Sequence, residues 1–335
     1  MKFTKKIFLL TAILTILLIA GCGQHTQPSV SESDVSSNSD LHENKPLTED
    51  DIIQLINNGK TIDDGDVAVP VNLDTPADEL SIPQDIEWHS MDESISTIVS
   101  ESDIVTGHKI GDTYFWGTDS QDNLHSIKIR VRKAAYLTID DWPNEEVTPK
   151  ILEVLEQYNV KATFFLCGYK KYQSIYPEIK AAGHSLGNHT YNHHKETIYA
   201  SKDAFMQDLS YMDNFLYGVA GVRPKIIRLP GGSHNSSLKN AGIEYRNDLL
   251  KRLQSKGYRI FDWTATFGDT STTASTEKSI ELIKKQCTED YEIILMHHKQ
   301  TSLEALPTVI EYLRDSDYEL FPITDSTPQY IFYMG

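Results

Sequence analysis

The stretch AAYLTIDDWPNEEVTPKILEVLEQYNVKATFFLC, residues 134–167, sets the pattern for most of the chain. Ala135–Asp140 predicts a buried strand, Val147–Gln157 has the spacing of an amphipathic helix, and Ala162–Cys167 predicts a second strand. A strand, a helix and a second strand in this order are typical of a parallel β-α-β unit.

Strand and helix patterns alternate along the rest of the chain. Further strands are predicted at Ser185–His189, Lys225–Leu229, Arg259–Trp263, Glu292–Met296 and Glu319–Ile323, and further helices at Ala204–Tyr217, Ile243–Lys256, Glu277–Lys285 and Leu303–Arg314. About seven strand–helix units predict a parallel α/β domain, either doubly wound or a barrel one unit short of the regular eight.

The first strand ends in two adjacent carboxylates, Asp140 and Asp141, each of which raises the cost of ionising the other. Polar residues also stand at the ends of other predicted strands. Because parallel strands point their C-terminal ends to one face of the sheet, these residues are expected to converge there. The residues are Asp140, Asp141, His189, His193, Arg228, Trp263, Asp269, His297 and His298.

A metal site would explain the aspartate pair. His189 and His193 are four residues apart, so on a helical turn both imidazoles would project from one face. One aspartate would complete a His₂–carboxylate set with an open position, the pattern of catalytic zinc sites. The other could accept a proton from water, held ionised by a bidentate pair with Arg228. Taken singly, the histidine pair and Arg228 are each more typical of structural roles. His194 is an alternative to His193 as the second histidine ligand.

Five short motifs carry a family resemblance: TIDDWP (138–143), HTYNH (189–193), RLPGG (228–232), WTATFGD (263–269) and ILMHH (294–298). In this order they resemble the motifs of the polysaccharide deacetylase family, the metal-dependent carbohydrate esterases with a NodB-homology domain. The resemblance covers roughly residues 134–324. It implies a distorted (β/α)₇-type barrel that hydrolyses N-acetyl, and sometimes O-acetyl, groups on polysaccharides.

The resemblance also implies a role for each matching residue. The metal would be one divalent ion, zinc before Co²⁺, Ni²⁺ or Mn²⁺. Three departures from the family pattern bear on the substrate: Trp142 replaces the usual glycine, Thr270 a tryptophan and His298 an aspartate. The implied roles are metal ligands for Asp141, His189 and His193, general base for Asp140, orienting arginine for Arg228, acetyl-pocket wall for Trp263, oxyanion donor for the Gly231 N–H, general acid for His297 and its tuning carboxylate for Asp269.

The N-terminus predicts export. Three lysines precede an apolar run, Ile7–Ala20, and the run ends at IAGC, residues 19–22, which resembles a bacterial lipobox. We expect a signal peptide over 1–21, a lipid on Cys22, and a polar, flexible tether over 22–49 that holds the protein at the extracytoplasmic face of the membrane. A plain transmembrane anchor is the alternative, for which the run is short.

Residues 50–132 are loop-rich and predict either a small accessory domain or a lead-in to the catalytic domain, 133–335. The net charge of −17 disfavours nucleic acid as a partner. Cys167 and Cys287 are expected to be buried free thiols, and the protein to be a monomer. The expected substrate is N-acetylglucosamine of peptidoglycan, with chitin oligomers, exopolysaccharide, muramyl residues or O-acetylated xylan as alternatives. Rival classes are a carbohydrate-binding lipoprotein without catalysis and a solute-binding protein.

Overall fold

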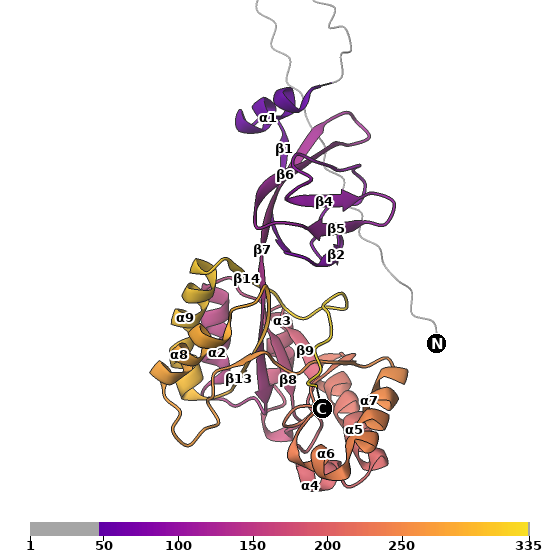
Figure 1. The fold of residues 1–335 in the computed structure, drawn as a ribbon, viewed down its shortest axis with the longest axis vertical. Coiled ribbons are helices and arrows are strands. Elements are labelled where there is room, and N and C mark those ends of the chain that lie inside the picture. The colour runs from indigo at the N-terminus through magenta and orange to yellow at the C-terminus, as the bar shows by residue number, and fades with distance from the viewer. Residues whose placement is uncertain (1–46, 334–335) are drawn as a thin grey trace, which may run out of the picture. The chain divides into compact units, whose positions relative to one another are not determined.

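The computed structural model describes residues 47–333, and Figure 1 shows their fold. The predicted signal peptide, Cys22 and almost all of the predicted tether lie outside the described residues. The helices are α1 (Glu49–Asn57), α2 (Thr148–Gln157), η1 (Lys170–Tyr172, a 3₁₀ helix), α3 (Ile175–Ala181), α4 (Lys195–Ile198), α5 (Lys202–Ala220), α6 (Ser236–Ala241), α7 (Ile243–Ser255), α8 (Thr276–Gln286) and α9 (Gln300–Asp315). Among the described residues, none of these helices has both the length and the hydropathy that a membrane span needs.

The strands fall into two sheets. A small antiparallel sheet has the order β2 (Asp74–Pro76), β5 (Ile104–Gly107), β4 (Ser96–Val99). All other strands belong to the larger sheet: β1 (Ile62–Pro70), β3 (His89–Ser90), β6 (Gly111–Thr118), β7 (Leu124–Asp141), β8 (Thr163–Leu166), β9 (Ser185–Asn188), β10 (Ile226–Ile227), β11 (Arg259–Ile260), β12 (Ala265–Thr266), β13 (Tyr291–His297) and β14 (Tyr318–Leu320).

The N-terminal region, residues 48–132, is mostly β-structure around its own apolar core. Its helix α1 begins with a capping box, in which the Thr48 hydroxyl and the Asp51 carboxylate accept from each other's backbone N–H. β1 pairs in parallel and β6 antiparallel with the first half of β7. Buried Val69, Val105 and Phe115 lie in this core, so the region has a packed interior.

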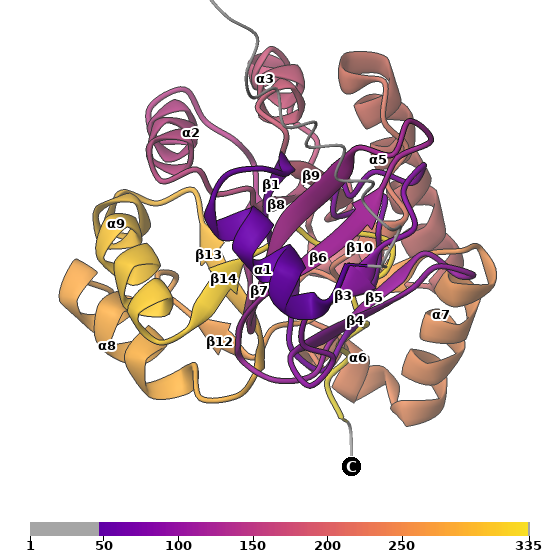
Figure 2. The same cartoon turned by 90° about the horizontal axis from the view of Figure 1, so that it is seen from above.

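The second half of β7 and the later strands form a parallel sheet in the order β11–β10–β9–β8–β7–β13–β12, and β14 pairs in parallel with β7 at Lys133–Ala135, outside this order. Helices α2, α3, α5, α7, α8 and α9 surround it (Figure 2). The two edge strands, β11 and β12, are consecutive in the chain, and the short segment 261–264 joins them. The sheet is therefore curled rather than flat, and the predicted α/β fold, a distorted (β/α)₇-type barrel, is confirmed.

All seven strands and all five helices predicted for this sheet are present, with shifted ends. The first strand, β7, begins at Leu124, well before the predicted Ala135. At the fifth predicted strand, Arg259–Trp263, β11 stops at Ile260, so Trp263 lies in the joining segment. The sequence missed β12, the short helices α4 and α6, and α3, because two-residue strands and one- or two-turn helices leave too few residues to show a period.

Strand β7 links the N-terminal region to the parallel sheet. It runs unbroken through residue 132, where the sequence suggests a domain boundary, and ends at the aspartate pair. Asp141 has a positive φ of 83°, a conformation that costs free energy for a residue with a side chain. The strand therefore ends in a strained residue at the face where the other strands also end.

Candidate active site

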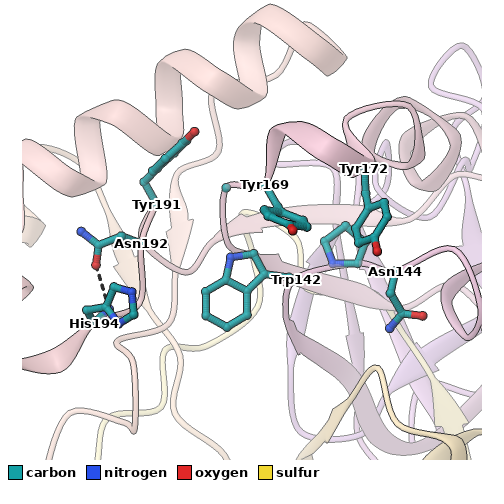
Figure 3. Close-up of a pocket in the computed structure, with 9 residues that line it drawn as sticks. Trp142, Asn144, Tyr169, Tyr172, Tyr191, Asn192 and His194 are labelled. Carbon is teal, nitrogen blue, oxygen red and sulfur yellow. Dashed lines mark hydrogen bonds between the residues drawn. The ribbon is translucent and has the colours of Figure 1, made fainter.

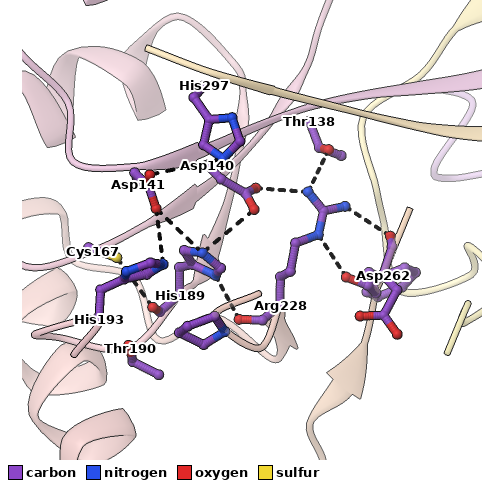
Figure 4. A network of polar contacts seen from close by, with 12 residues as sticks. Thr138, Asp140, Asp141, Cys167, His189, Thr190, His193, Arg228, Asp262 and His297 are labelled. Atoms are coloured by element: carbon purple, nitrogen blue, oxygen red, sulfur yellow. Dashed lines mark hydrogen bonds and ion pairs between the residues drawn. The ribbon is translucent and has the colours of Figure 1, made fainter. Parts of the chain in front are cut away.

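The ends of four strands of the parallel sheet supply the residues of the site (Figure 4). Asp140 and Asp141 are the last residues of β7, and His297 is the last residue of β13. His189 and Arg228 directly follow β9 and β10. Asp140 and His297 are partners in the register of β7 and β13, so residues far apart in sequence meet here.

The two histidines stand in a loop, and the helical turn predicted for them is wrong. Residues 189–194 contain no helix, and α4 begins at Lys195. Thr190 and His193 have positive φ values of 67° and 60°. These left-handed residues turn the backbone, and the rings of His189 and His193 lie with centroids 5.0 Å apart.

This loop is held by the Asp208 carboxylate in α5, which the sequence reasoning missed. The carboxylate accepts hydrogen bonds from the backbone N–H of Tyr191 at 2.6 Å and of Asn192 at 3.2 Å, and from the Asn192 amide at 2.5 Å. Asp208 is 8% exposed. The available signal was its spacing, because it follows the buried Phe205 by three residues and so falls on the apolar face of the helix.

Asp141, His189 and His193 form what we call the histidine cluster. The Asp141 Oδ1 atom lies 3.6 Å from His189 Nε2 and 3.3 Å from His193 Nε2. Ligand atoms around a tetrahedral zinc ion are separated by roughly 3.3–3.6 Å, given zinc–ligand bonds of about 2.0–2.2 Å. The two distances from Asp141 to the histidines therefore suit ligands of one small divalent cation.

The hydrogen bonding of the histidine cluster supports this fit. His189 Nδ1 donates to the Arg228 carbonyl oxygen at 2.8 Å, and burial lowers the pKa of His189 to about 3. The ring is therefore neutral, with a lone pair on Nε2. Asp141 Oδ1 is buried and accepts no hydrogen bond from any described residue. Two lone-pair donors facing each other without a shared proton are repulsive, and a cation between them removes the repulsion.

Cys167 is the other side chain able to reach such a cation. Its Sγ and ligand atoms of Asp141 and His189 all lie within 4.8 Å of one another. The thiol donates to the His189 carbonyl oxygen at 3.3 Å, and burial raises its pKa well above the usual value. Without a cation, Cys167 is a neutral thiol engaged with that carbonyl. His193 and Cys167 are therefore the two candidates for the third ligand, and His193 Nε2 lies 3.3 Å from Asp141 Oδ1. Cys167 and Cys287 are buried free thiols, as predicted.

Arg228, Asp140 and Thr138 form the arginine cluster, which is buried inside the curled sheet. Arg228 is 0% exposed and Asp140 2% exposed. The arginine Nη1 donates to Asp140 Oδ1 at 2.8 Å and to Thr138 Oγ1 at 2.7 Å. Burial raises the pKa of Asp140, against the charge of Arg228, which lowers it. Asp140 is thus a fixed carboxylate that takes up a proton more readily than a solvated aspartate.

The bidentate pair predicted between Arg228 and Asp140 is wrong, because only Nη1 reaches the carboxylate. Nε donates instead to the Phe261 carbonyl oxygen at 2.8 Å and Nη2 to that of Asp262 at 3.0 Å. Both carbonyls belong to the segment that joins the edge strands. Asp140 Oδ2 therefore takes no hydrogen bond from the arginine and lies 3.6 Å from His189 Nε2, beside the histidine cluster.

His297 and Asp269 form a third group. His297 Nδ1 donates to Asp269 Oδ1 at 2.7 Å, and Asp269 Oδ2 accepts from the His297 backbone N–H at 2.7 Å. Burial lowers the pKa of His297, but the hydrogen bond and charge of Asp269 outweigh it, so the pKa is raised overall. Ser302 in α9, which the sequence reasoning missed, also donates to Asp269 Oδ2. His297 Nε2 is left to face Asp141 Oδ2 at 4.0 Å.

The two other predicted substrate contacts, Gly231 and Trp263, follow β10 and β11. The Trp263 ring has the Arg228 guanidinium carbon 5.8 Å from its centroid and packs edge-on against Phe332 at 5.0 Å. Gly231 has a φ of 76°, and a Cβ there would lie 2.6 Å from Lys195 Nζ. Within residues 47–333 its N–H makes no hydrogen bond with backbone or side chain, which leaves it able to donate to a ligand.

The departures from the family motifs have different surroundings. Trp142 is half-buried and lies edge-on to the His193 ring, with centroids 5.3 Å apart. His298 is buried; its Nδ1 lies 2.9 Å from the Thr148 hydroxyl and its ring 5.9 Å from that of Phe164. Thr270 is exposed. His298 therefore packs into the core, and Trp142 is the substitution that adjoins the histidine cluster.

Comparisons with known proteins agree with this geometry. Residues 128–246 match the family model described as Polysaccharide deacetylase. A peptidoglycan-N-acetylglucosamine deacetylase of Bacillus cereus is 29% identical over 200 residues, which are 56% of this chain and 68% of that protein. A bifunctional xylanase/deacetylase of Pseudobutyrivibrio xylanivorans is 30% identical over 222 residues, 64% of this chain and 33% of that longer protein.

A solved structure shows the same fold. The catalytic domain of a peptidoglycan N-acetylglucosamine deacetylase from Eubacterium rectale superposes with a TM-score of 0.58 at 31% identity, over 61% of this chain and 94% of that domain. That likeness spans nearly all of the solved catalytic domain. The chain therefore belongs to the polysaccharide deacetylase family and is a hydrolase that deacetylates polysaccharide.

Proposed function

We propose that the protein removes the acetyl group from N-acetylglucosamine in peptidoglycan, with one divalent cation, zinc by preference, held by the histidine cluster. The observation that carries the proposal is the position of Asp140. Its Oδ1 is held by Arg228 at 2.8 Å, and its Oδ2 lies 3.6 Å from His189 Nε2. A buried base is thus fixed beside a cation site, with His297 on the neighbouring strand.

Each group of the site has one task in this reaction. A divalent cation on Asp141, His189 and His193 would supply Lewis acidity, which lowers the pKa of a water to about 7 and polarises the acetyl carbonyl. Asp140 Oδ2 accepts the proton of the attacking water, because Oδ1 is engaged by Arg228. The water oxygen bonds to the acetyl carbon, and the Gly231 N–H donates to the oxygen that becomes negative.

His297 completes the reaction as the general acid. Its Nδ1 is engaged by Asp269, so Nε2 gives its proton to the sugar nitrogen as the carbon–nitrogen bond breaks. The products are acetate and a free amine. Asp140 then releases its proton, and His297 takes one up, which returns the site to its starting state.

Three observations support peptidoglycan as the substrate. The B. cereus relative and the E. rectale domain are both peptidoglycan N-acetylglucosamine deacetylases. The lipobox-like IAGC and the polar segment after it favour a lipid anchor on Cys22 at the extracytoplasmic face, within reach of the cell wall. The family itself implies an acetylated polysaccharide as the partner.

The test is acetate release from intact peptidoglycan by the zinc-loaded protein, with a chelator-treated sample beside it. We expect acetate and new free amines in the glycan, loss of both after chelation, and recovery on adding zinc. If the zinc-loaded protein releases no acetate from peptidoglycan but acts on another acetylated glycan, the assignment of peptidoglycan as the substrate is wrong. Activity that survives complete chelation would contradict the cation.

Acetylated xylan is the second candidate. The match to the bifunctional xylanase/deacetylase of P. xylanivorans, at 30% identity, favours it. An ester needs less help from a general acid than an amide, because an alcohol leaves more easily than an amine. Rates of acetate release from acetylxylan and from peptidoglycan, measured for wild type and for His297→Ala, separate the two candidates. If acetylxylan is the substrate, wild type should act faster on it than on peptidoglycan, and His297→Ala should lose little of its rate on acetylxylan.

A further inference from the structure

A pocket of 490 Å³ is lined by nine residues, among them Trp142, which directly follows the aspartate pair in the chain (Figure 3). This volume is within the range of about 300–1,000 Å³ that is typical of small-molecule sites. Four of its lining residues are aromatic: Trp142, Tyr169, Tyr172 and Tyr191. Hydrogen-bonding groups come from Asn144, Asn192 and His194. We call it the aromatic pocket.

The aromatic pocket adjoins the histidine cluster through the chain itself. Trp142 directly follows Asp141, and its ring lies edge-on to the His193 ring at a centroid distance of 5.3 Å. Tyr191 and Asn192 are the residues just before His193 in the same loop. A ligand in the aromatic pocket therefore lies next to whatever is bound at the histidine cluster.

Buried groups hold the wall of the pocket in place. The Gly168 N–H donates to the Tyr191 carbonyl oxygen at 3.0 Å, and a Cβ at Gly168 would lie only 2.2 Å from the Tyr191 ring, so that ring lies against bare backbone. The Tyr169 N–H donates to the hydroxyl of buried Tyr176 at 3.0 Å. Tyr169 and Tyr172 pack edge to face with centroids 5.1 Å apart. The rings are thus positioned before any ligand arrives.

The lining indicates a neutral ligand with one apolar face. None of the nine lining residues is an aspartate, a glutamate, a lysine or an arginine, although the whole chain carries a net charge of −17. Lys171, which is not a lining residue, donates to the Tyr172 hydroxyl at 3.0 Å and lies 4.7 Å from that ring's centroid. Tyr169 is 43% exposed, so part of its ring is open to solvent. A pyranose ring presents C–H groups on its faces and hydroxyls at its edge. Aromatic rings cover the former, and amide, phenol and imidazole groups hydrogen-bond the latter.

We infer that the aromatic pocket is a subsite for an uncharged sugar ring of the glycan, next to the sugar that loses its acetyl group. Trp142 is the residue that determines whether this subsite binds a sugar. This rests on the proposed deacetylation. A second hollow, of 610 Å³, shares Tyr191 and Asn192 with the aromatic pocket and adds Tyr211, which is 58% exposed. The shared residues would let a longer glycan continue from the aromatic pocket into this hollow, which Lys170 also lines.

The test compares substrate lengths. Acetate release is measured for the zinc-loaded protein on N-acetylglucosamine and its oligomers of two to five sugars. In Trp142→Gly and Tyr172→Ala, the ratio of kcat/KM for the longest oligomer to that for the shortest active substrate is expected to fall about 3- to 10-fold. Trp142→Phe keeps an aromatic face and most of the ratio. Tyr217→Ala, an exposed tyrosine of α5 that does not line the pocket, leaves the ratio unchanged.

The outcomes separate this inference from the proposed function. Wild type that releases no acetate from any length overturns the deacetylation on these glycans. An active wild type whose Trp142→Gly and Tyr172→Ala variants keep its ratio, or lose the same factor at every length, overturns the subsite alone.

Binding without turnover gives a second readout. Calorimetric titration of zinc-loaded Asp140→Asn with the N-acetylglucosamine tetramer gives a Kd, which adding Tyr172→Ala is expected to raise about 3- to 10-fold and adding Tyr217→Ala to leave unchanged. If Tyr172→Ala weakens only ligands that carry a stem peptide and leaves the bare tetramer unaffected, the occupant is the peptide, and the sugar assignment is wrong.

Discussion

Asp140 and Asp141 are neighbours in the chain, yet their surroundings are opposite. Asp140 belongs to the arginine cluster, where it is 2% exposed and accepts a hydrogen bond from a fully buried guanidinium. Asp141 belongs to the histidine cluster, where its Oδ1 is buried and accepts no hydrogen bond from a described residue, and its φ is 83°. The positive charge for one carboxylate is built into the protein, and that for the other has to be bound from outside.

The largest effect is expected from Asp141→Ala. Removing this ligand should abolish tight zinc binding and lower kcat/KM by roughly 10⁴-fold or more, because a catalytic metal supplies several kcal/mol of transition-state stabilisation. Zinc content after gel filtration and acetate release check both effects. If Asp141→Ala keeps a full equivalent of zinc, the division of tasks between the two aspartates is wrong.

Asp140→Asn should lower kcat/KM by about 10²–10⁴-fold while the protein keeps its zinc, because only the proton acceptor is lost. The paired measurement, zinc content beside acetate release, distinguishes this variant from Asp141→Ala. Far-UV circular dichroism confirms that the protein is folded. A variant that loses zinc and activity together would place Asp140 among the ligands.

Arg228→Met should destabilise the fold by about 3–5 kcal/mol, because it leaves the Asp140 carboxylate buried without its partner. Urea unfolding measures the free energy of unfolding. Arg223→Met, at an exposed arginine, is the control and should change it by no more than about 0.5 kcal/mol. The double variant Asp140→Asn/Arg228→Met should recover part of the loss; a double variant as unstable as the two single losses added together would show that the two side chains do not depend on each other.

Asp269→Asn should lower kcat/KM about 10- to 100-fold, as is usual when the partner of a reacting group is removed. The Asp269 hydrogen bond and charge raise the pKa of His297. Without them that pKa falls, so the alkaline limb of the pH–rate profile should move to lower pH, because the general acid must be protonated. An alkaline limb at the same pH in both proteins would mean that His297 is not the acid.

His297 and Asp269 also contribute to the stability of the fold, and the directions of their pKa shifts determine how that contribution changes with pH. The raised pKa of His297 contributes stability that is complete below about pH 6.5 and is lost as the pH rises through the folded pKa. Burial raises the pKa of Asp269, but the hydrogen bond and charge of His297 outweigh it and lower it overall. That contribution is complete above about pH 4 and is lost on acidification. Asp269→Asn should therefore destabilise the protein most between about pH 4 and 6.5.

The sequence predicted which strands bring polar residues to the site, but it predicted the geometry of the loops poorly. Strand ends follow from short apolar runs, and parallel pairing then brings Asp140 beside His297 whatever the loops do. The loop of His189 and His193 could not be predicted, because Thr190 is β-branched and such residues rarely adopt a left-handed conformation. Histidine adopts it more often, but a single histidine does not mark the position of a turn. Its support by Asp208 comes from a helix that is separate in sequence.

The arrangement of Arg228 shows a second limit. An arginine at the end of a predicted strand indicated a cationic partner for Asp140, and in the structure Arg228 donates a hydrogen bond to that carboxylate. Which of its N–H groups reach the carboxylate depends on the carbonyls of Phe261 and Asp262, which compete for the others. Those carbonyls lie in the segment that joins β11 to β12, and the sequence gives no sign that this segment crosses to the far edge of the sheet.

Strand β7 has a consequence for the order in which the protein is made. Its first half pairs with β1 and β6, and its second half with β13 and β14 from late in the chain. The Thr138 hydroxyl donates to the Ile294 carbonyl oxygen, 156 residues away in sequence. Contacts of such long range form slowly, because a large loop must close first. Most of the chain after β7 therefore has to be present before β13 brings His297 to the aspartate pair.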